Sequence, residues 1–198
     1  KEEISGRVTI TPWYRGLGRR DTIYLLWRMM EDEDATKYVF YGQDLDPQDE
    51  AMRGDLVDFV RFFEPQIGDY KQTLMCQDKQ GEFMGCSWFE KINLGVRANY
   101  GVFLRRRYWG SMAREASRMS FEWAFDSEKG LGVQEILAYS PWRWAVSHGE
   151  WLGMKVVDVI PSMCILDNVP RRIVYKEKPL DVTVLKITRA EFYGKLAT

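Results

Sequence analysis

The stretch that decides the fold runs from Val96 to Met154 and reads VRANYGVFLRRRYWGSMAREASRMSFEWAFDSEKGLGVQEILAYSPWRWAVSHGEWLGM. Its pattern predicts a strand at Val96–Leu104, an arginine-rich turn, and then a helix of about four turns. A second strand at Val133–Tyr139 and a short helix that ends at Met154 follow. A turn that leads into a helix N-terminus can hold the phosphate groups of a cofactor.

The flanking sequence predicts a mostly antiparallel sheet interrupted by helices. The expected strands are Val8–Thr11, Lys71–Gln77, Phe83–Ile92, Lys155–Ile160 and Leu180–Thr188, and the expected helices are Thr22–Glu33, capped by Asp21, and a second that begins at Asp46-Pro47. No linker or repeat divides the chain, so we expect a single domain over residues 1–198 of the α+β class, with helices flanking a mixed central sheet.

Composition limits the classes of partner. The chain has 198 residues, with 28 basic and 29 acidic side chains. The chain has short basic runs at Arg105–Arg107 and Arg171-Arg172, but it lacks a net positive charge. Nucleic-acid binding is therefore the least favoured of the three functions that we consider. No run of about 18 apolar residues exists, so we expect no membrane span.

Three cysteines and one histidine are too few for a structural zinc site. Their odd number and spacing predict reduced thiols and a cytoplasmic setting, with Cys76 and Cys86 flanking one hairpin turn. The chain also holds eight tryptophans, ten tyrosines and ten phenylalanines. Most of these are expected in the core, and some are available to cover a protein partner.

Two motifs resemble those of the GCN5-related N-acetyltransferase (GNAT) superfamily, especially its ribosomal-protein N-terminal acetyltransferase branch. Pro141–Met154 resembles that branch's Asn-x-x-(Ala/Ser)-x-x-x-x-Glu-x-Leu-Gly-(Phe/Met) helix, with Trp142 in place of the Asn. Tyr108–Ala116 resembles Trp-Gly-Lys-Gly-(Ile/Tyr)-Ala-Thr-Glu-Ala and keeps the Glu-Ala pair. The resemblance covers most of the chain in the order of its elements.

The resemblance implies transfer of an acetyl group from acetyl-CoA to an unidentified amine-bearing substrate. The residues implied in cofactor binding are Val102, Phe103, Leu104, Arg105, Arg106, Arg107, Gly110, Ser111 and Met112. The family's pyrophosphate turn, (Arg/Gln)-x-x-Gly-x-(Gly/Ala), is degenerate here. Depending on the alignment, Tyr108 or Trp109 occupies a glycine position, where the backbone must approach the ligand closely. The arginines equally fit a solvated turn, or pairing with acidic residues near Asp49 and Asp55.

The resemblance implies direct attack of the amine on the thioester, which needs a base, an oxyanion donor and an acid. A backbone N–H near Val102–Leu104 is the expected oxyanion donor. Glu90 is the candidate base, although an exposed strand glutamate explains it as well. Ser147 is a candidate anchor for a catalytic water, and His148 is expected either to titrate near neutrality or to be structural. Cys164 lacks a basic partner in sequence, so no covalent mechanism is expected.

An alternative reading is a catalytically inactive relative that keeps the fold as a structural or binding subunit, for example in a bacteriophage virion. The lost glycines and the many aromatic residues favour it, as does the absence of the tyrosine that the resemblance implies as the acid on the last motif helix. The two hypotheses differ in whether coenzyme A binds and turns over.

Overall fold

The computed structural model describes residues 8–12, 24, 28–29, 71–161 and 181–196. Tyr24, Arg28 and Met29 are helical, as expected for the first predicted helix. The remainder of that helix, the helix expected from Asp46, and the predictions on Cys164 and Arg171-Arg172 lie outside the described residues.

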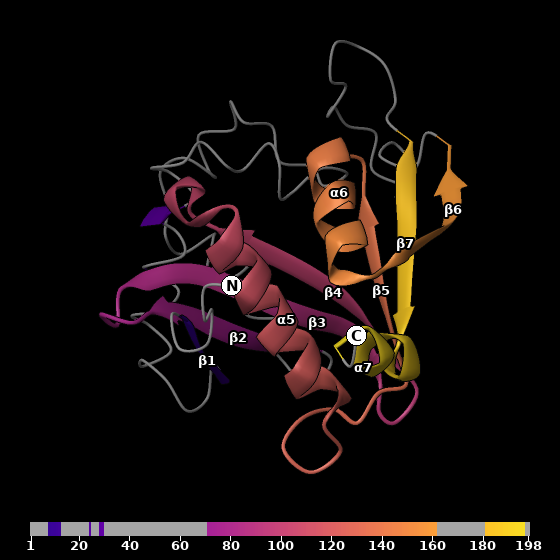
Figure 1. Cartoon of the computed structure of the whole chain (residues 1–198), viewed down its shortest axis with the longest axis horizontal. Helices are drawn as coiled ribbons and strands as arrows, with labels where there is room; N and C mark the ends of the chain where they lie inside the picture. Colours follow the sequence, from indigo (N-terminus) through magenta and orange to yellow (C-terminus); the bar gives the residue numbers. More distant parts are fainter. Residues whose placement is uncertain (1–7, 13–23, 25–27, 30–70, 162–180, 197–198) are drawn as a thin grey trace.

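The centre of the molecule is a seven-stranded sheet (Figure 1). Its strands are β1 (Val8–Pro12), β2 (Lys71–Asp78), β3 (Phe83–Asn93), β4 (Arg97–Leu104), β5 (Glu135–Ser140), β6 (Lys155–Ile160) and β7 (Val182–Thr188). Their order in the sheet is β1-β2-β3-β4-β5-β7-β6. Only β4 and β5 pair in parallel, while the other neighbours are antiparallel. This confirms the predicted α+β class with a mixed, mostly antiparallel sheet.

Two helices lie on one face of this sheet, one over the β1–β4 side and the other over β5 and β7 (Figure 1). They are α5 (Ser111–Phe125), preceded by the short 3-10 turn η2 (Arg106–Tyr108), and α6 (Arg143–Leu152). Gly153 follows α6 with φ of 96°, a left-handed conformation that suits glycine at a helix end. The strands predicted from Val133 and Leu180 begin two residues later, at Glu135 and Val182.

A third helix, α7 (Arg189–Leu196), was not predicted. Its start is a capping box, because the Glu191 carboxylate accepts the Thr188 N–H at 3.0 Å and the Glu191 N–H donates to the Thr188 hydroxyl at 3.3 Å. The Thr-x-x-Glu spacing was the available signal. α7 contributes a single buried side chain among those described, Phe192, so its sequence lacks a long apolar stripe.

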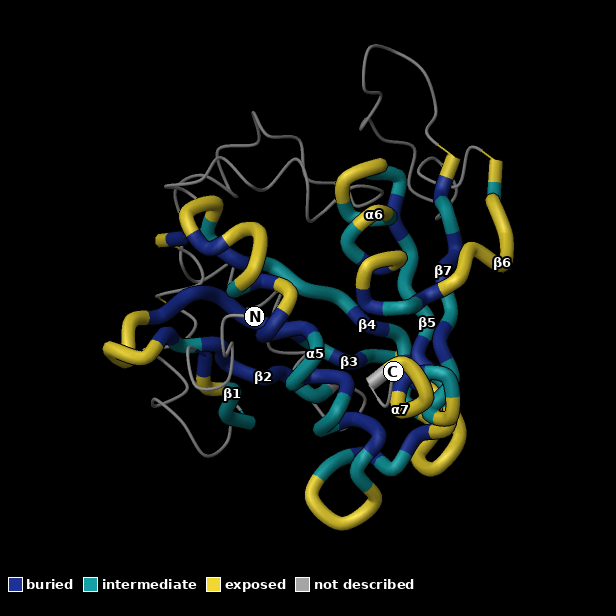
Figure 2. Tube along the Cα trace, in the orientation of Figure 1, coloured by how far each residue is buried: buried dark blue, intermediate teal, exposed yellow. Residues whose placement is uncertain are grey.

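One hydrophobic cluster contains buried residues from β2, β3, β4, β5 and β7 (Figure 2). It contains Phe89 and Tyr100 from β3 and β4, Phe121 from α5, and Leu185 from β7. The ring of Tyr100 meets the ring of Phe121 edge-on, with centroids 4.8 Å apart. This packing holds β4, α5 and β5 in fixed positions, and the candidate site lies between them.

Candidate functional site

The strands β4 and β5 separate partway along their length. They pair only over Arg97–Tyr100 and Glu135–Ala138, yet β4 continues to Leu104 and β5 to Ser140. Figure 1 shows the two strands diverging beyond this point. We call the region between the diverging ends of β4 and β5 the splay.

Backbone groups of β4 face the splay. The Arg105 N–H donates to the Met84 carbonyl at 2.9 Å, and Leu104 lies opposite Gly85. In an antiparallel pair, alternate residues direct their N–H and C=O groups toward the partner strand and away from it. Leu104 and Val102 therefore point these groups into the splay, whereas Phe103 pairs with β3. Of the three β4 residues predicted to bind cofactor, two present backbone donors and acceptors there.

The N-terminus of α5 lies at the end of the turn that follows β4. Gly110 adopts φ of 94° and ψ of −128°, a conformation that side-chain-bearing residues avoid. The first helical hydrogen bond runs from the Arg114 N–H to the Gly110 carbonyl at 3.1 Å. The N–H groups of Ser111, Met112 and Ala113 therefore have no acceptor within the helix, which makes this end suitable for an anion.

The three predicted arginines have different surroundings. The Arg105 Nε is buried and has no hydrogen-bond partner, and Arg106 is exposed. Arg107 forms an ion pair with Glu82 at 2.7 Å and donates to the Tyr108 hydroxyl at 2.9 Å. Arg107 is thus directed at the β2–β3 hairpin, although its side chain is exposed like that of Arg106.

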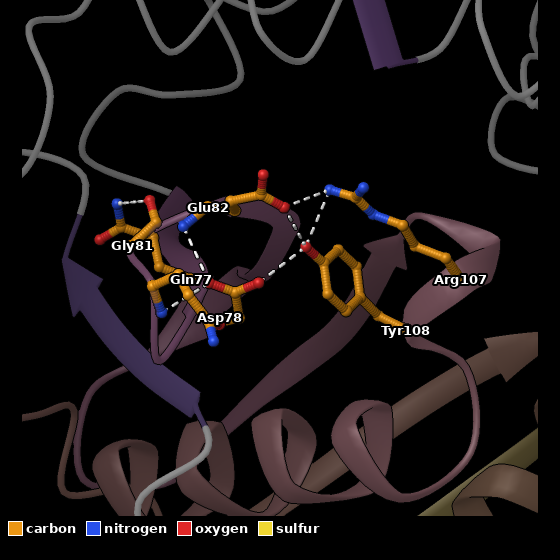
Figure 3. A network of polar contacts seen from close by, with 7 residues as sticks. Gln77, Asp78, Gly81, Glu82, Arg107 and Tyr108 are labelled. Atoms are coloured by element: carbon orange, nitrogen blue, oxygen red, sulfur yellow. Dashed lines mark hydrogen bonds and ion pairs between the residues drawn. The ribbon is translucent and has the colours of Figure 1, made fainter.

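Tyr108 anchors the turn to the same hairpin (Figure 3). Its hydroxyl donates to the Asp78 Oδ2 at 3.0 Å, while the Asp78 Oδ1 accepts the N–H groups of Gln80 and Glu82, each at 2.9 Å. Burial raises the pKa of Asp78, but these hydrogen bonds outweigh it and hold the pKa below its usual value. Burial and the neighbouring carboxylates raise the pKa of Tyr108. Tyr108 therefore points away from the splay.

Trp109 turns the opposite way. Its ring stacks on that of Trp144 from α6, with centroids 5.1 Å apart and planes at 23°. Its Nε1 donates to the Leu104 carbonyl at 2.9 Å. Both indoles remain about half exposed, at 47% for Trp109 and 49% for Trp144. This pairing was not predictable from the sequence, because nothing local to either tryptophan specifies the other.

A polar chain runs from β4 to α6. The Tyr100 hydroxyl donates to the Ser117 Oγ at 2.9 Å, and that oxygen lies 2.9 Å from the His148 Nε2. Burial, with a smaller contribution from the charge of Arg114, lowers the pKa of His148 to about 4. His148 is therefore neutral at pH 7, which agrees with the structural role rather than with titration near neutrality.

The structure does not bring the two predicted catalytic residues together. Glu90 lies opposite Asn99, next to the Phe89–Tyr100 pair. Neighbouring residues of a strand face opposite sides of the sheet, and Tyr100 faces α5, so Glu90 lies on the other face. Ser147 is exposed on α6, on the α5 side of the sheet.

The described part of the chain contains no group of three or more metal-ligating side chains. None of its helices is long and apolar enough to cross a membrane. Cys76 and Cys86 are both buried, lie on the adjacent strands β2 and β3, and form no disulfide.

Comparison with solved structures identifies the fold. A spermidine N-acetyltransferase from Vibrio cholerae, in complex with CoA and spermine, matches with a TM-score of 0.68 at 13% identity, over 94% of this chain and 98% of that chain. The N152L mutant of the same enzyme, SpeG, gives 0.69 at 12% identity, over 96% and 98%. Its dodecameric form in an intermediate state gives 0.67 at 12%, with the same coverage. No protein-family model and no curated protein sequence matches the chain. The chain therefore has the GNAT fold.

Proposed function

We propose that this protein is an N-acyltransferase that takes an acetyl group from acetyl-CoA and transfers it to an amine. The observation that carries the proposal is the splay with the α5 N-terminus at its open end. The GNAT fold and the bound CoA of a structural neighbour support the choice of acyl donor. The α6 motif supports a place near the ribosomal-protein N-acetyltransferase branch.

The residues present fit such a donor. The backbone groups of Val102 and Leu104 offer hydrogen bonds to an extended amide chain, and the N–H groups of Ser111 and Met112 offer them to phosphates. The exposed Arg106 supplies positive charge beside them. Acetyl-CoA supplies an activated acyl group, and the backbone N–H of Val102 or Leu104 is placed to stabilise the oxyanion that forms on it.

The chemistry needs one proton acceptor and one donor. When the amine attacks the thioester carbon, the new C–N bond replaces the C–S bond and CoA leaves as a thiolate. The proton lost from the nitrogen must reach a base, and the thiolate takes up a proton from the donor. Glu90 stays the candidate base, acting through water from the far face of the sheet, and Ser147 stays the candidate anchor of a water on the α6 side. Spermidine-like polyamines belong in the first acceptor panel, since the structural neighbours are named for them.

The test is binding followed by turnover. A ligand at a hundred times its dissociation constant should raise the free energy of unfolding by about 2.7 kcal/mol, which a thermal melt with acetyl-CoA or CoA detects. We expect Arg106→Ala to weaken binding, while Arg97→Ala, an exposed arginine at the other end of β4, leaves it unchanged. Glu90→Gln should lower kcat with little change in coenzyme affinity. If acetyl-CoA binds but no CoA thiol is released with any amine of a broad panel, the proposed acetyltransferase activity is contradicted.

The competing reading is a binding or structural subunit, in a virion or elsewhere. The specific observation in its favour is the Trp109–Trp144 stack, which occupies the region where a coenzyme would enter. A wild-type protein that binds no CoA and forms a stable complex with another chain would support it.

A further inference from the structure

The Trp109–Trp144 stack bridges the open end of the splay. Trp109 lies in the turn after β4, and Trp144 lies in the first turn of α6, which follows β5. The two strands part beyond Tyr100 and Ala138. The stacked rings therefore connect the two sides of the splay beyond the C-terminal ends of β4 and β5.

The indole also uses a backbone group of the splay. Leu104 directs its carbonyl away from β3, and no β5 residue pairs with it. The Trp109 Nε1–H satisfies this carbonyl at 2.9 Å. An extended ligand amide lying along β4 would need the same acceptor, so the side chain and the ligand compete for it.

We propose that Trp109 and Trp144 control access to the splay, and that coenzyme A enters only when the stack opens. The inference rests on the proposed function, because it assumes that the splay is where the acyl donor binds. Both rings are about half exposed, and the stacked ring faces and the hydrogen bond from Trp109 to Leu104 help to hold them together. These contacts are modest and can be broken by a ligand that replaces them.

The experiment is calorimetric titration of CoA into the wild type and four variants. Trp109→Ala and Trp144→Ala remove the stack, and we expect each to tighten CoA binding about tenfold, the factor that corresponds to 1.4 kcal/mol. Trp109→Phe keeps an aromatic ring but loses the N–H, so it should lie between the wild type and Trp109→Ala. Trp151→Ala is the matched control, since Trp151 is an exposed indole on α6 outside the stack, and it should bind as the wild type does.

Each other result overturns the inference. Weaker CoA binding in Trp109→Ala and Trp144→Ala would show that the indoles contact the ligand. Unchanged CoA binding would show that the stack does not lie on the route by which CoA enters the splay. In both cases the proposed function survives, because CoA still binds. Failure of every variant to bind CoA, with the native fold verified by circular dichroism, would remove the proposed function together with the inference.

Discussion

At the residue scale, His148 makes the stability of the protein depend on pH between about pH 4 and pH 6.5. Its folded pKa of about 4 lies below the value of 6.5 for an unperturbed histidine. The folded state therefore resists protonation, and its stability is full above pH 6.5 and is lost as pH falls toward 4. From pH 7 to pH 5 we expect a loss of about 1 to 2 kcal/mol in urea unfolding.

The carboxyl groups with lowered pKa values in the described part of the chain act mainly outside this window. Asp78, Asp126 and Glu191 also have lowered pKa values, but their ordinary pKa values are 4.5 or less, so they act mainly below pH 5. His148 is the sole histidine of the chain. A His148→Gln variant should therefore show a flat stability between pH 7 and pH 5, and an unchanged slope would contradict the assignment.

Gly101 is fixed by a neighbour on the next strand. A Cβ at this position would lie 2.3 Å from two ring atoms of Trp88, which is opposite it on β3. We expect Gly101→Ala to lower the free energy of unfolding by about 1 to 3 kcal/mol, as overpacking does. Gly194→Ala on α7 is the control, because nothing lies within 4 Å of its Cβ position, and it should leave stability unchanged or raise it slightly.

At the element scale, β4 should show alternating amide exchange. Gly101 and Phe103 pair with β3, whereas Val102 and Leu104 face the splay. Exchange at the last two should be faster by about tenfold or more, since a solvent-facing amide needs no unfolding to open. Residue-resolved hydrogen exchange by NMR measures this. Added CoA should then slow Val102 and Leu104 selectively, whereas uniform protection along β4 would show that the splay is closed.

The elements themselves were largely predictable, and the reasons are local. Alternation identified β2, β3 and β4, and helical spacing with terminal glycines identified α5 and α6. α7 was not predicted, because it has too few buried apolar side chains to produce a helical pattern in the sequence. The sequence correctly predicted that Glu90 lies on the strand beside β4. It did not predict that Glu90 lies on the face away from α5, because assigning the face requires the register between the strands as well as the alternation.

The site was predictable only where backbone geometry decides it. Gly110 and the α5 N-terminus follow from the sequence of the turn. Arg105, Arg106 and Arg107 looked equivalent, because each one's surroundings are set by residues distant in sequence, such as Glu82 for Arg107. The same holds for the pKa of His148, which depends on burial against α5 and on Arg114.

At the scale of the whole molecule, the sheet has two parts that share a short seam. β1 to β4 form one part, and β5, β7 and β6 form the other, joined directly only through Arg97–Tyr100 and Glu135–Ala138. The strand pairing alone would allow the parts to unfold separately. The core argues otherwise, because a single cluster holds Phe89 from one part, Leu185 from the other, and Phe121 of α5 between them.

We therefore expect one cooperative transition that depends on Phe121. This ring is fully buried and contacts the rings of Tyr100, Phe125 and Phe192. Phe121→Ala should lower the free energy of unfolding by about 3 to 5 kcal/mol, with far-UV dichroism and tryptophan fluorescence still changing together. Leu94→Ala, at a position 70% exposed, should cost less than about 0.5 kcal/mol. Separation of the two probes in the Phe121 variant would show that the seam, rather than the shared core, limits cooperativity, and that the splay lies between two independently folding parts.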